Sequence, residues 1–159
     1  MKFATLTTLL IAAAATTQAV PTAKPKSFAR ALKPFLLQDV TAKILSDVDF
    51  ATLTLTLIDQ NVNNTTTSCE WWWHPDEAIP ETTVVSCTNT NYELNFPDTT
   101  RVDIEDFVLR VETTASAALQ ESGDVSLVAS AQSLWTCQSN VTAYIKEQCS
   151  YNGVVEVPV

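Results

Sequence analysis

Four cysteines have the spacing that most directly predicts chemistry: Cys69, Cys87, Cys137 and Cys149. A zinc site would require close Cys-x-x-Cys pairs or added histidines, and the sequence contains one histidine. An even number of cysteines in an exported chain instead predicts two disulfides, for which three pairings are possible. Pairing of sequence neighbours would close loops of 18 and 12 residues. Each such loop would contribute on the order of 3 kcal/mol to stability.

The segment Trp71-Trp72-Trp73-His74 is the most conspicuous aromatic cluster. In a strand, Trp71 and Trp73 face one way while Trp72 and His74 face the other. Exposed indoles at Trp71 and Trp73 would stack on a sugar ring or a flat phenolic ligand. The alternative is that one face fills the core and the other packs under a loop beside the Cys69 disulfide, which we favour because large aromatic side chains are more often buried.

Residues suited to catalysis or metal binding are few. His74 is the one imidazole base, and no Gly-x-Ser-x-Gly motif supplies a nucleophile for it. Asp103, Glu105 and Asp106 lack the glycine turn of a calcium-binding loop. A hydrolase with two opposed carboxylates is a rival hypothesis, because 18 acidic residues are present, but no pattern points to a pair. We therefore predict no catalytic residue, metal ion or cofactor.

The first nineteen residues have the form of a secretory signal. Lys2 precedes an apolar stretch over residues 6–15, and Thr17-Gln18-Ala19 offers the small residues of a cleavage site. No later stretch reaches the roughly 18 apolar residues of a membrane span. In a secreted chain, the sequons at Asn63, Asn64 and Asn140 predict glycosylation, with at most one of the adjacent pair occupied.

Charge and composition exclude several classes of protein. Nine basic and 18 acidic residues leave a formal charge of −9, which is a poor match to nucleic acid and makes a small nuclease improbable. Hydrophobic content of 46% argues against intrinsic disorder, and two glycines exclude a glycine-rich phosphate loop. Residues 20–34 contain four cations, no acid and three prolines. They predict a mobile basic arm before a single domain at 35–159.

The remaining pattern is that of short strands. Residues 53–57, Leu-Thr-Leu-Thr-Leu, alternate strictly, as a half-buried strand requires. A bulge near Glu105–Asp106 would bring Val102 and Ile104 to the same side as Phe107 and Leu109. A helical turn is possible at 32–37 or 115–119. We expect an all-β fold, a compact antiparallel β-barrel or sandwich stapled by two disulfides, with further strands over 40–45, 82–87, 92–96, 125–137, 141–145 and 154–157.

The order of several short motifs resembles one family. A signal-like segment and a Leu-Thr strand are followed by SCEWWWH, VVSC, NYELNF, DFVLRV, SLWTC and QCSY. This order is similar to that of the Alternaria major-allergen-like family of small fungal secreted proteins, over roughly residues 38–157. The resemblance implies a compact β-barrel with the disulfides Cys69–Cys87 and Cys137–Cys149. Some members form a disulfide-linked dimer through an extra N-terminal cysteine, which residues 20–68 lack.

The resemblance also implies a function. Members resemble no known enzyme, and several act at the host surface as virulence factors or elicitors of plant defence. Some bind plant pathogenesis-related proteins or small phenolics. We therefore expect a secreted, non-enzymatic protein that acts by extracellular recognition of a host protein or a phenolic ligand. The alternative is a carbohydrate- or phenolic-binding module that uses Trp71 and Trp73.

Overall fold

The structure is a computed structural model that describes residues 31–80, 82–97 and 101–159. The predicted signal segment at 1–19 and most of the basic arm, residues 20–30, lie outside these residues. The described chain contains ten strands, all paired in antiparallel fashion: β1 (Phe35–Leu45), β2 (Ala51–Asp59), β3 (Thr65–Trp73), β4 (Val85–Ser86), β5 (Tyr92–Asn95), β6 (Asp106–Thr113), β7 (Ser122–Val128), β8 (Trp135–Thr142), β9 (Ile145–Tyr151) and β10 (Val155–Val157).

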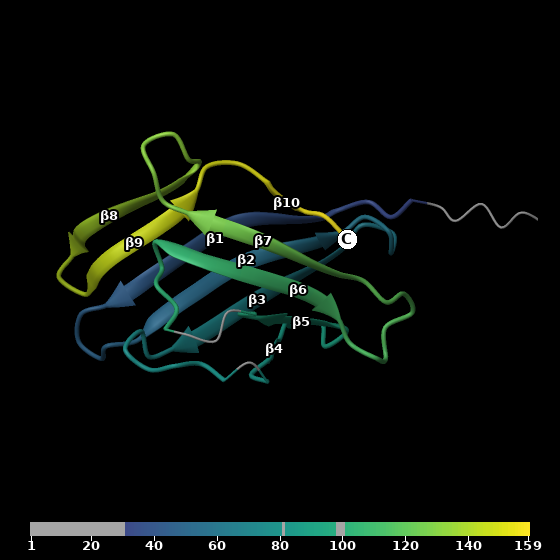
Figure 1. Ribbon diagram of the computed structural model, residues 1–159, viewed down its shortest axis with the longest axis horizontal. Helices are drawn as coiled ribbons and strands as arrows, with labels where there is room; N and C mark the ends of the chain where they lie inside the picture. Colours follow the sequence, from purple (N-terminus) through teal and green to yellow (C-terminus); the bar gives the residue numbers. More distant parts are fainter. Residues whose placement is uncertain (1–30, 81, 98–100) are drawn as a thin grey trace, which may run out of the picture. The chain divides into compact units, whose positions relative to one another are not determined.

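The strands form two sheets. The larger sheet has the order β3-β2-β1-β9-β8, with β10 beside the first part of β1, and the smaller has the order β4-β5-β6-β7. Figure 1 shows β6 and β7 crossing in front of β1, β2 and β3. The prediction of an all-β antiparallel fold is confirmed. The prediction allowed a barrel or a sandwich, and the structure is a sandwich. No continuous ladder of strands in the described residues closes the two sheets into a barrel.

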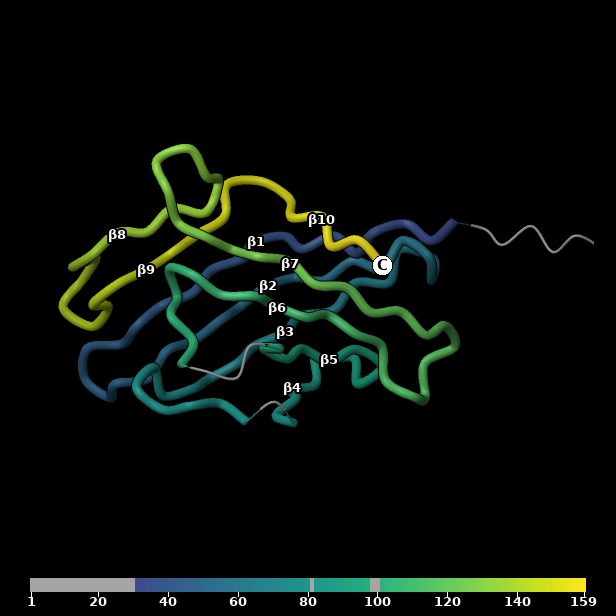
Figure 2. Tube along the Cα trace, viewed as in Figure 1, coloured from purple at the N-terminus to yellow at the C-terminus, as the bar shows by residue number. Residues whose placement is uncertain are grey.

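Alternation of side chains places the core between the sheets. In β2, Leu53, Leu55 and Leu57 are buried, whereas Thr54 is exposed, as the strict Leu-Thr pattern predicts. An aromatic row then crosses the core from one sheet to the other. Phe96, just after β5, stacks on Trp71 with ring centres 4.3 Å apart, and Phe107 of β6 meets Trp135 of β8 at 5.9 Å. Figure 2 shows β6 and β7 running across the strands β1, β2 and β3 along the Cα trace.

A bulge divides β1 into two parts with different partners. The register with β2 shifts between Gln38 and Thr41, and Asp39 within this segment has a positive φ of 53°. Before the bulge the odd-numbered side chains point into the core, and after it the even-numbered ones do. Leu37 and Val40 are therefore both buried. The first part of β1 pairs with β10 and the second part with β9, on the same edge.

Four local predictions are corrected. The run 141–145 is not one strand, because β8 ends at Thr142 and β9 begins at Ile145. Both apolar sets around residue 105 are buried as expected, but a tight turn replaces the predicted bulge: the Asp106 N–H donates to the Asp103 main-chain oxygen, 3.2 Å away. The run 125–137 is not one strand, because β7 ends at Val128 and β8 begins at Trp135. Neither of the suggested helical turns, 32–37 or 115–119, is helical in the described chain: Phe35 to Leu37 belong to β1, and 115–119 form turns and bends.

The disulfides are Cys69–Cys87 and Cys137–Cys149, the neighbour pairing that the family resemblance implies. Cys69 lies in β3 and Cys87 directly follows β4, so the first bond connects the two sheets. The second joins Cys137 and Cys149, which are directly opposite each other in β8 and β9. All four cysteines of the sequence are used, so none remains to link two chains.

The sheets also approach closely at a second corner. Gly123 of β7 lies against the main chain of Pro158, just beyond β10, and a Cβ at this glycine would collide with the Pro158 carbonyl oxygen. The residues before β1 are held to the same end of the domain, because Asn61 accepts from the Lys33 N–H at 2.9 Å and donates to the Lys33 oxygen at 2.8 Å. The ordered domain thus begins slightly before the predicted boundary at residue 35. In the part of the chain that the structure describes, no helix has the length and apolar character to cross a membrane.

Candidate functional site

Trp71 and Trp73, the predicted ligand-stacking pair, lie in the core. Their side chains are only 3% and 5% exposed, and both contact the ring of Phe96. The expectation that this face of the strand fills the core is therefore confirmed, whereas the expectation that the other face packs under a loop is wrong for Trp72, which is 53% exposed. The alternative, in which Trp71 and Trp73 present their rings to a sugar or phenolic ligand, does not fit, because Phe96 and the facing sheet already cover them.

Trp72 is the exposed member of the cluster, at 53% of its surface. Its indole N–H donates to a Glu70 carboxylate oxygen 2.9 Å away. The ring of Phe50 packs edge-on against Trp72 and lies tilted on the ring of His74, with centres 4.0 Å apart. The single imidazole of the chain is thus packed against an aromatic ring, and Trp72 is the tryptophan of this cluster that a ligand could reach.

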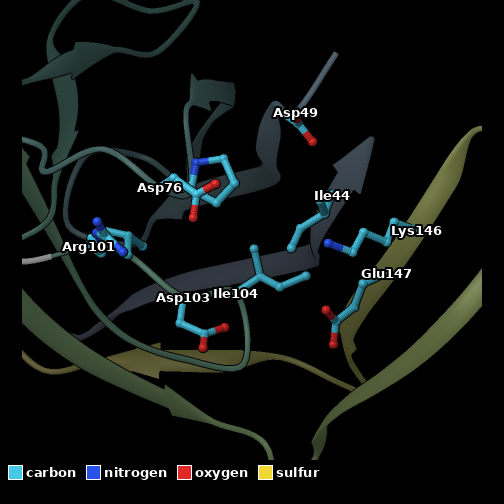
Figure 3. Close-up of a pocket in the computed structure, with 10 residues that line it drawn as sticks. Ile44, Asp49, Asp76, Arg101, Asp103, Ile104, Lys146 and Glu147 are labelled. Atoms are coloured by element: carbon cyan, nitrogen blue, oxygen red, sulfur yellow. The ribbon is translucent and has the colours of Figure 1, made fainter. Parts of the chain in front are cut away.

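A pocket of about 310 Å³ opens where loops from both sheets meet. Figure 3 shows Ile44 and Ile104 near its centre, with charged side chains around them. Four segments build it: the end of β1 with the following turn, residues 75–76, residues 101–104, and the start of β9. Its lining residues are Ile44, Asp49, Pro75, Asp76, Arg101, Val102, Asp103, Ile104, Lys146 and Glu147.

Two buried tryptophans fix one wall of this pocket from behind. The indole N–H of Trp73 donates to the Val102 main-chain oxygen at 3.2 Å, and that of Trp135 donates to the Ile104 oxygen at 3.0 Å. Both tryptophans belong to the larger sheet, whereas residues 102 and 104 precede the first long strand of the smaller one. Trp73 therefore positions the pocket wall and does not itself line the pocket.

The charges around the pocket are mixed and mainly acidic. Asp49, Asp76, Asp103 and Glu147 face Arg101 and Lys146 around the two isoleucines (Figure 3). Burial raises the pKa of Glu147, and the nearby carboxyl of Glu105 raises it further, whereas Lys146 opposes the shift. The arrangement provides an apolar floor with charged walls, which suits binding of a group with an apolar body and a cationic end.

A second polar cluster is enclosed at the opposite end of β1. Asp59 at the end of β2 is fully buried, and Glu121, just before β7, is 6% exposed. The Tyr92 hydroxyl donates to Asp59 at 2.9 Å, and the Asn61 amide donates to Glu121 at 2.5 Å. Burial, and next the charge of Asp59, raise the pKa of Glu121 to about 7. Burial and the bond to Asp59 raise the pKa of Tyr92 to about 12.

This enclosed pair connects the sheets. Glu121 retains one buried oxygen without a hydrogen-bond partner, and burial beside Asp59 raises its pKa, so this carboxyl binds a proton more readily than an exposed one. No group of three or more His, Cys, Asp or Glu side chains in the described residues could hold a metal ion. The acids Asp103, Glu105 and Asp106 form the turn before β6, where the Asp103 carboxylate accepts from the Glu105 N–H.

The three predicted glycosylation sites are exposed and lie at turns or strand ends. Asn63 and Asn64 are within the β2–β3 connection, and Asn140 is near the end of β8. All three have a positive φ between 53° and 55°, which asparagine tolerates better than most residues. Their side chains are accessible for modification, and occupancy stays a prediction.

Neither the pocket nor the enclosed acids Asp59 and Glu121 were predicted from the sequence. One signal for the latter was available: Asp59 has the same parity as Leu53, Leu55 and Leu57, which predicts an inward carboxylate. No comparable signal marks Glu121, or the lining residues Ile44, Asp76 and Glu147, because segments distant in the sequence bring them together. No family model matches this chain, and no curated protein is found to be similar to it.

Proposed function

We propose that this chain is a secreted, non-enzymatic protein that acts outside the cell by binding a partner, in the manner of an effector or elicitor at a host surface. Two intramolecular disulfides support an oxidising compartment. The signal-like first nineteen residues support export. The family resemblance supports a fungal origin and a plant extracellular protein as the partner.

The observation that carries the recognition role is the pocket formed by the four segments at the end of the sandwich. Its 101–104 wall is held by the Trp73 and Trp135 indoles, so the binding surface is formed before a partner arrives. A pre-formed surface costs less conformational entropy on binding than a mobile loop. His74 packs on Phe50 and the four cysteines form disulfides, so neither the imidazole nor a thiol lines the pocket.

The charges indicate what kind of partner surface would fit. Four carboxylates and two cations line the pocket, which favours a basic side chain from the partner. Its alkyl stem would lie on the partly buried Ile44, and its cationic group would reach Asp103 or Glu147. A basic plant extracellular protein is therefore the expected partner.

Binding to extracellular plant proteins tests this function. The secreted chain would be immobilised and incubated with leaf apoplastic fluid, and a captured protein would be purified and titrated. Asp76→Lys reverses a pocket charge, whereas Glu77→Lys makes the same change at an adjacent exposed residue that does not line the pocket. We expect Asp76→Lys to weaken binding about tenfold and Glu77→Lys to leave it unchanged. Equal effects of the two variants, or no saturable partner, would refute the proposal.

A small phenolic ligand is a second candidate for the same pocket. The volume of about 310 Å³ lies at the lower end of the range for small-molecule sites. Trp73 hydrogen-bonds to Val102 directly behind the wall, so its fluorescence would report occupancy. Titration with a flavonoid panel should quench this emission in the wild type and in Glu77→Lys. A flat titration across the panel would eliminate phenolic binding.

A further inference from the structure

The outer face of the larger sheet differs from the rest of the molecule. Strand register places two rows of side chains across its five long strands, each row on the side opposite the buried residues. Seven of the ten positions are Thr, Ser or Gln, and six of these seven are exposed or half-buried, whereas Thr52 is only 6% exposed. One row is Glu70, Thr54, Thr41, Ser150 and Thr136, and the other is Trp72, Thr52, Lys43, Gln148 and Gln138.

Trp72 forms an oriented aromatic platform at one edge of this face. Its N–H donates to Glu70, two residues earlier in the same strand, at 2.9 Å. Residues so spaced are roughly 7 Å apart, so the bond draws the indole along the strand. Phe50 supports its edge, with an angle of 71° between the rings. The ring is thus held in place while about half of its surface stays open to solvent.

The low net charge of this face indicates the class of ligand that it would bind. The ten positions include one acid, Glu70, and one base, Lys43, whereas the whole sequence carries a formal charge of −9. A locally neutral surface of hydroxyl and amide groups complements a neutral polyhydroxyl ligand better than a charged one. An exposed indole stacks on the apolar face of a pyranose ring, while Thr, Ser and Gln exchange hydrogen bonds with its hydroxyls.

We propose that this face binds an extended neutral polysaccharide, with one sugar ring on Trp72 and the following rings across β2, β1, β9 and β8. Four inter-strand spacings give a track of about 19 Å, long enough for several sugar rings. The face is separate from the end pocket, which Ile44 and Glu147 line from the inner side of the same sheet. The proposal therefore adds a cell-wall glycan to the proposed extracellular recognition and does not depend on a protein partner.

Retention on insoluble polysaccharides tests the proposal. The full chain would be secreted from yeast, freed of N-linked glycans, and mixed separately with cellulose, chitin and β-1,3-glucan. We expect saturable binding to at least one of them, competed by its soluble oligosaccharide. Trp72→Ala should weaken binding about tenfold, whereas Tyr144→Ala, which removes another exposed aromatic ring at the β8–β9 turn, should not. The combined change Gln138→Ala and Gln148→Ala should also weaken binding and leaves the aromatic residues intact.

The controls separate the possible results. Asp76→Lys should retain glycan binding, because it changes only the pocket. Failure of the proposed protein binding at the pocket would therefore leave the proposed glycan binding unaffected. The unfolding midpoint of each variant establishes whether that variant is folded. If Trp72→Ala does not fold, the binding of the double glutamine variant decides whether this face binds the polysaccharide. Lack of retention on all three polysaccharides would overturn the proposal. Retention that is equal in Trp72→Ala, the glutamine variant and wild type would do so as well.

Discussion

The indole N–H of Trp135 donates a hydrogen bond to the main-chain oxygen of Ile104, 3.0 Å away, through the core of the sandwich. Trp135 belongs to β8 of the larger sheet, and Ile104 lines the pocket just ahead of β6 in the smaller one. Both residues are fully buried. This bond therefore links core packing directly to the shape of the candidate site, because a carbonyl that loses its partner there has no access to water.

Replacing Trp135 with Phe should destabilise the domain and loosen the pocket. Phenylalanine retains aromatic packing against Phe107 but removes the bond to Ile104 and leaves a void. The cost should be on the order of 2 to 3 kcal/mol in urea-induced unfolding. Trp72→Phe, a matched change at an exposed indole, should cost less than about 1 kcal/mol. Equal losses for the two variants would contradict the role given to Trp135.

Stability should decrease as the pH rises through the titration of Glu121. Its folded-state pKa of about 7 lies above the ordinary value of 4.5, so the folded state binds the proton more tightly than the unfolded state. The stabilisation is fully present below about pH 4.5 and is lost as the pH rises through about 7. The change should be about 3 kcal/mol, measured by urea unfolding between pH 4.5 and 8.

Glu121→Gln provides the control for this pH dependence. The amide stays neutral at every pH and matches the carboxylic acid in shape, so most of the slope should disappear and the variant should be more stable than wild type at pH 8. A smaller slope of the same sign should persist, since the pKa of Glu147 is also raised. An unaltered slope in Glu121→Gln would show that other groups govern the effect.

The two disulfides should each contribute on the order of 3 kcal/mol, from loops of 18 and 12 residues. Replacing Cys69 and Cys87 with alanine should cost more than the same change at Cys137 and Cys149. The first bond closes the longer loop and joins the two sheets, whereas the second links neighbouring strands that are already paired. Thermal unfolding with and without reductant provides the measurement. A melting temperature unchanged by reductant would contradict both contributions.

The two glycines should respond to alanine for different reasons. At Gly123 the added methyl group would collide with Pro158, where β7 meets the chain beyond β10, and the cost should be about 3 kcal/mol. At Gly153 the nearest atom lies 3.9 Å away, but φ is +131°, so a strain of about 1 to 2 kcal/mol is expected from the backbone alone. Denaturant unfolding of both variants would measure the difference. A milder effect at Gly123 than at Gly153 would argue against the close contact of the sheets.

Local sequence patterns were sufficient to predict most strands and which of their side chains are buried in the core. The Leu-Thr alternation of residues 53–57 identified β2 and its inward face, and the aromatic parity of residues 71–73 separated Trp72 from its neighbours. Period-two alternation is a property of consecutive residues, so it can be read from the chain alone. The cysteine count likewise predicted two disulfides, while their pairing came from resemblance.

Only the tertiary structure decided how these strands assemble and what their surfaces offer. Two sheets form in place of a closed barrel, because in the described residues no ladder joins β3 or β8 to a strand of the smaller sheet, and β1 divides its edge between β9 and β10. The pocket, the enclosed Asp59–Glu121 pair and the polar rows beside Trp72 each unite side chains from several strands. Such groupings depend on register and sheet order, and these arise from long-range pairing that local sequence patterns do not encode.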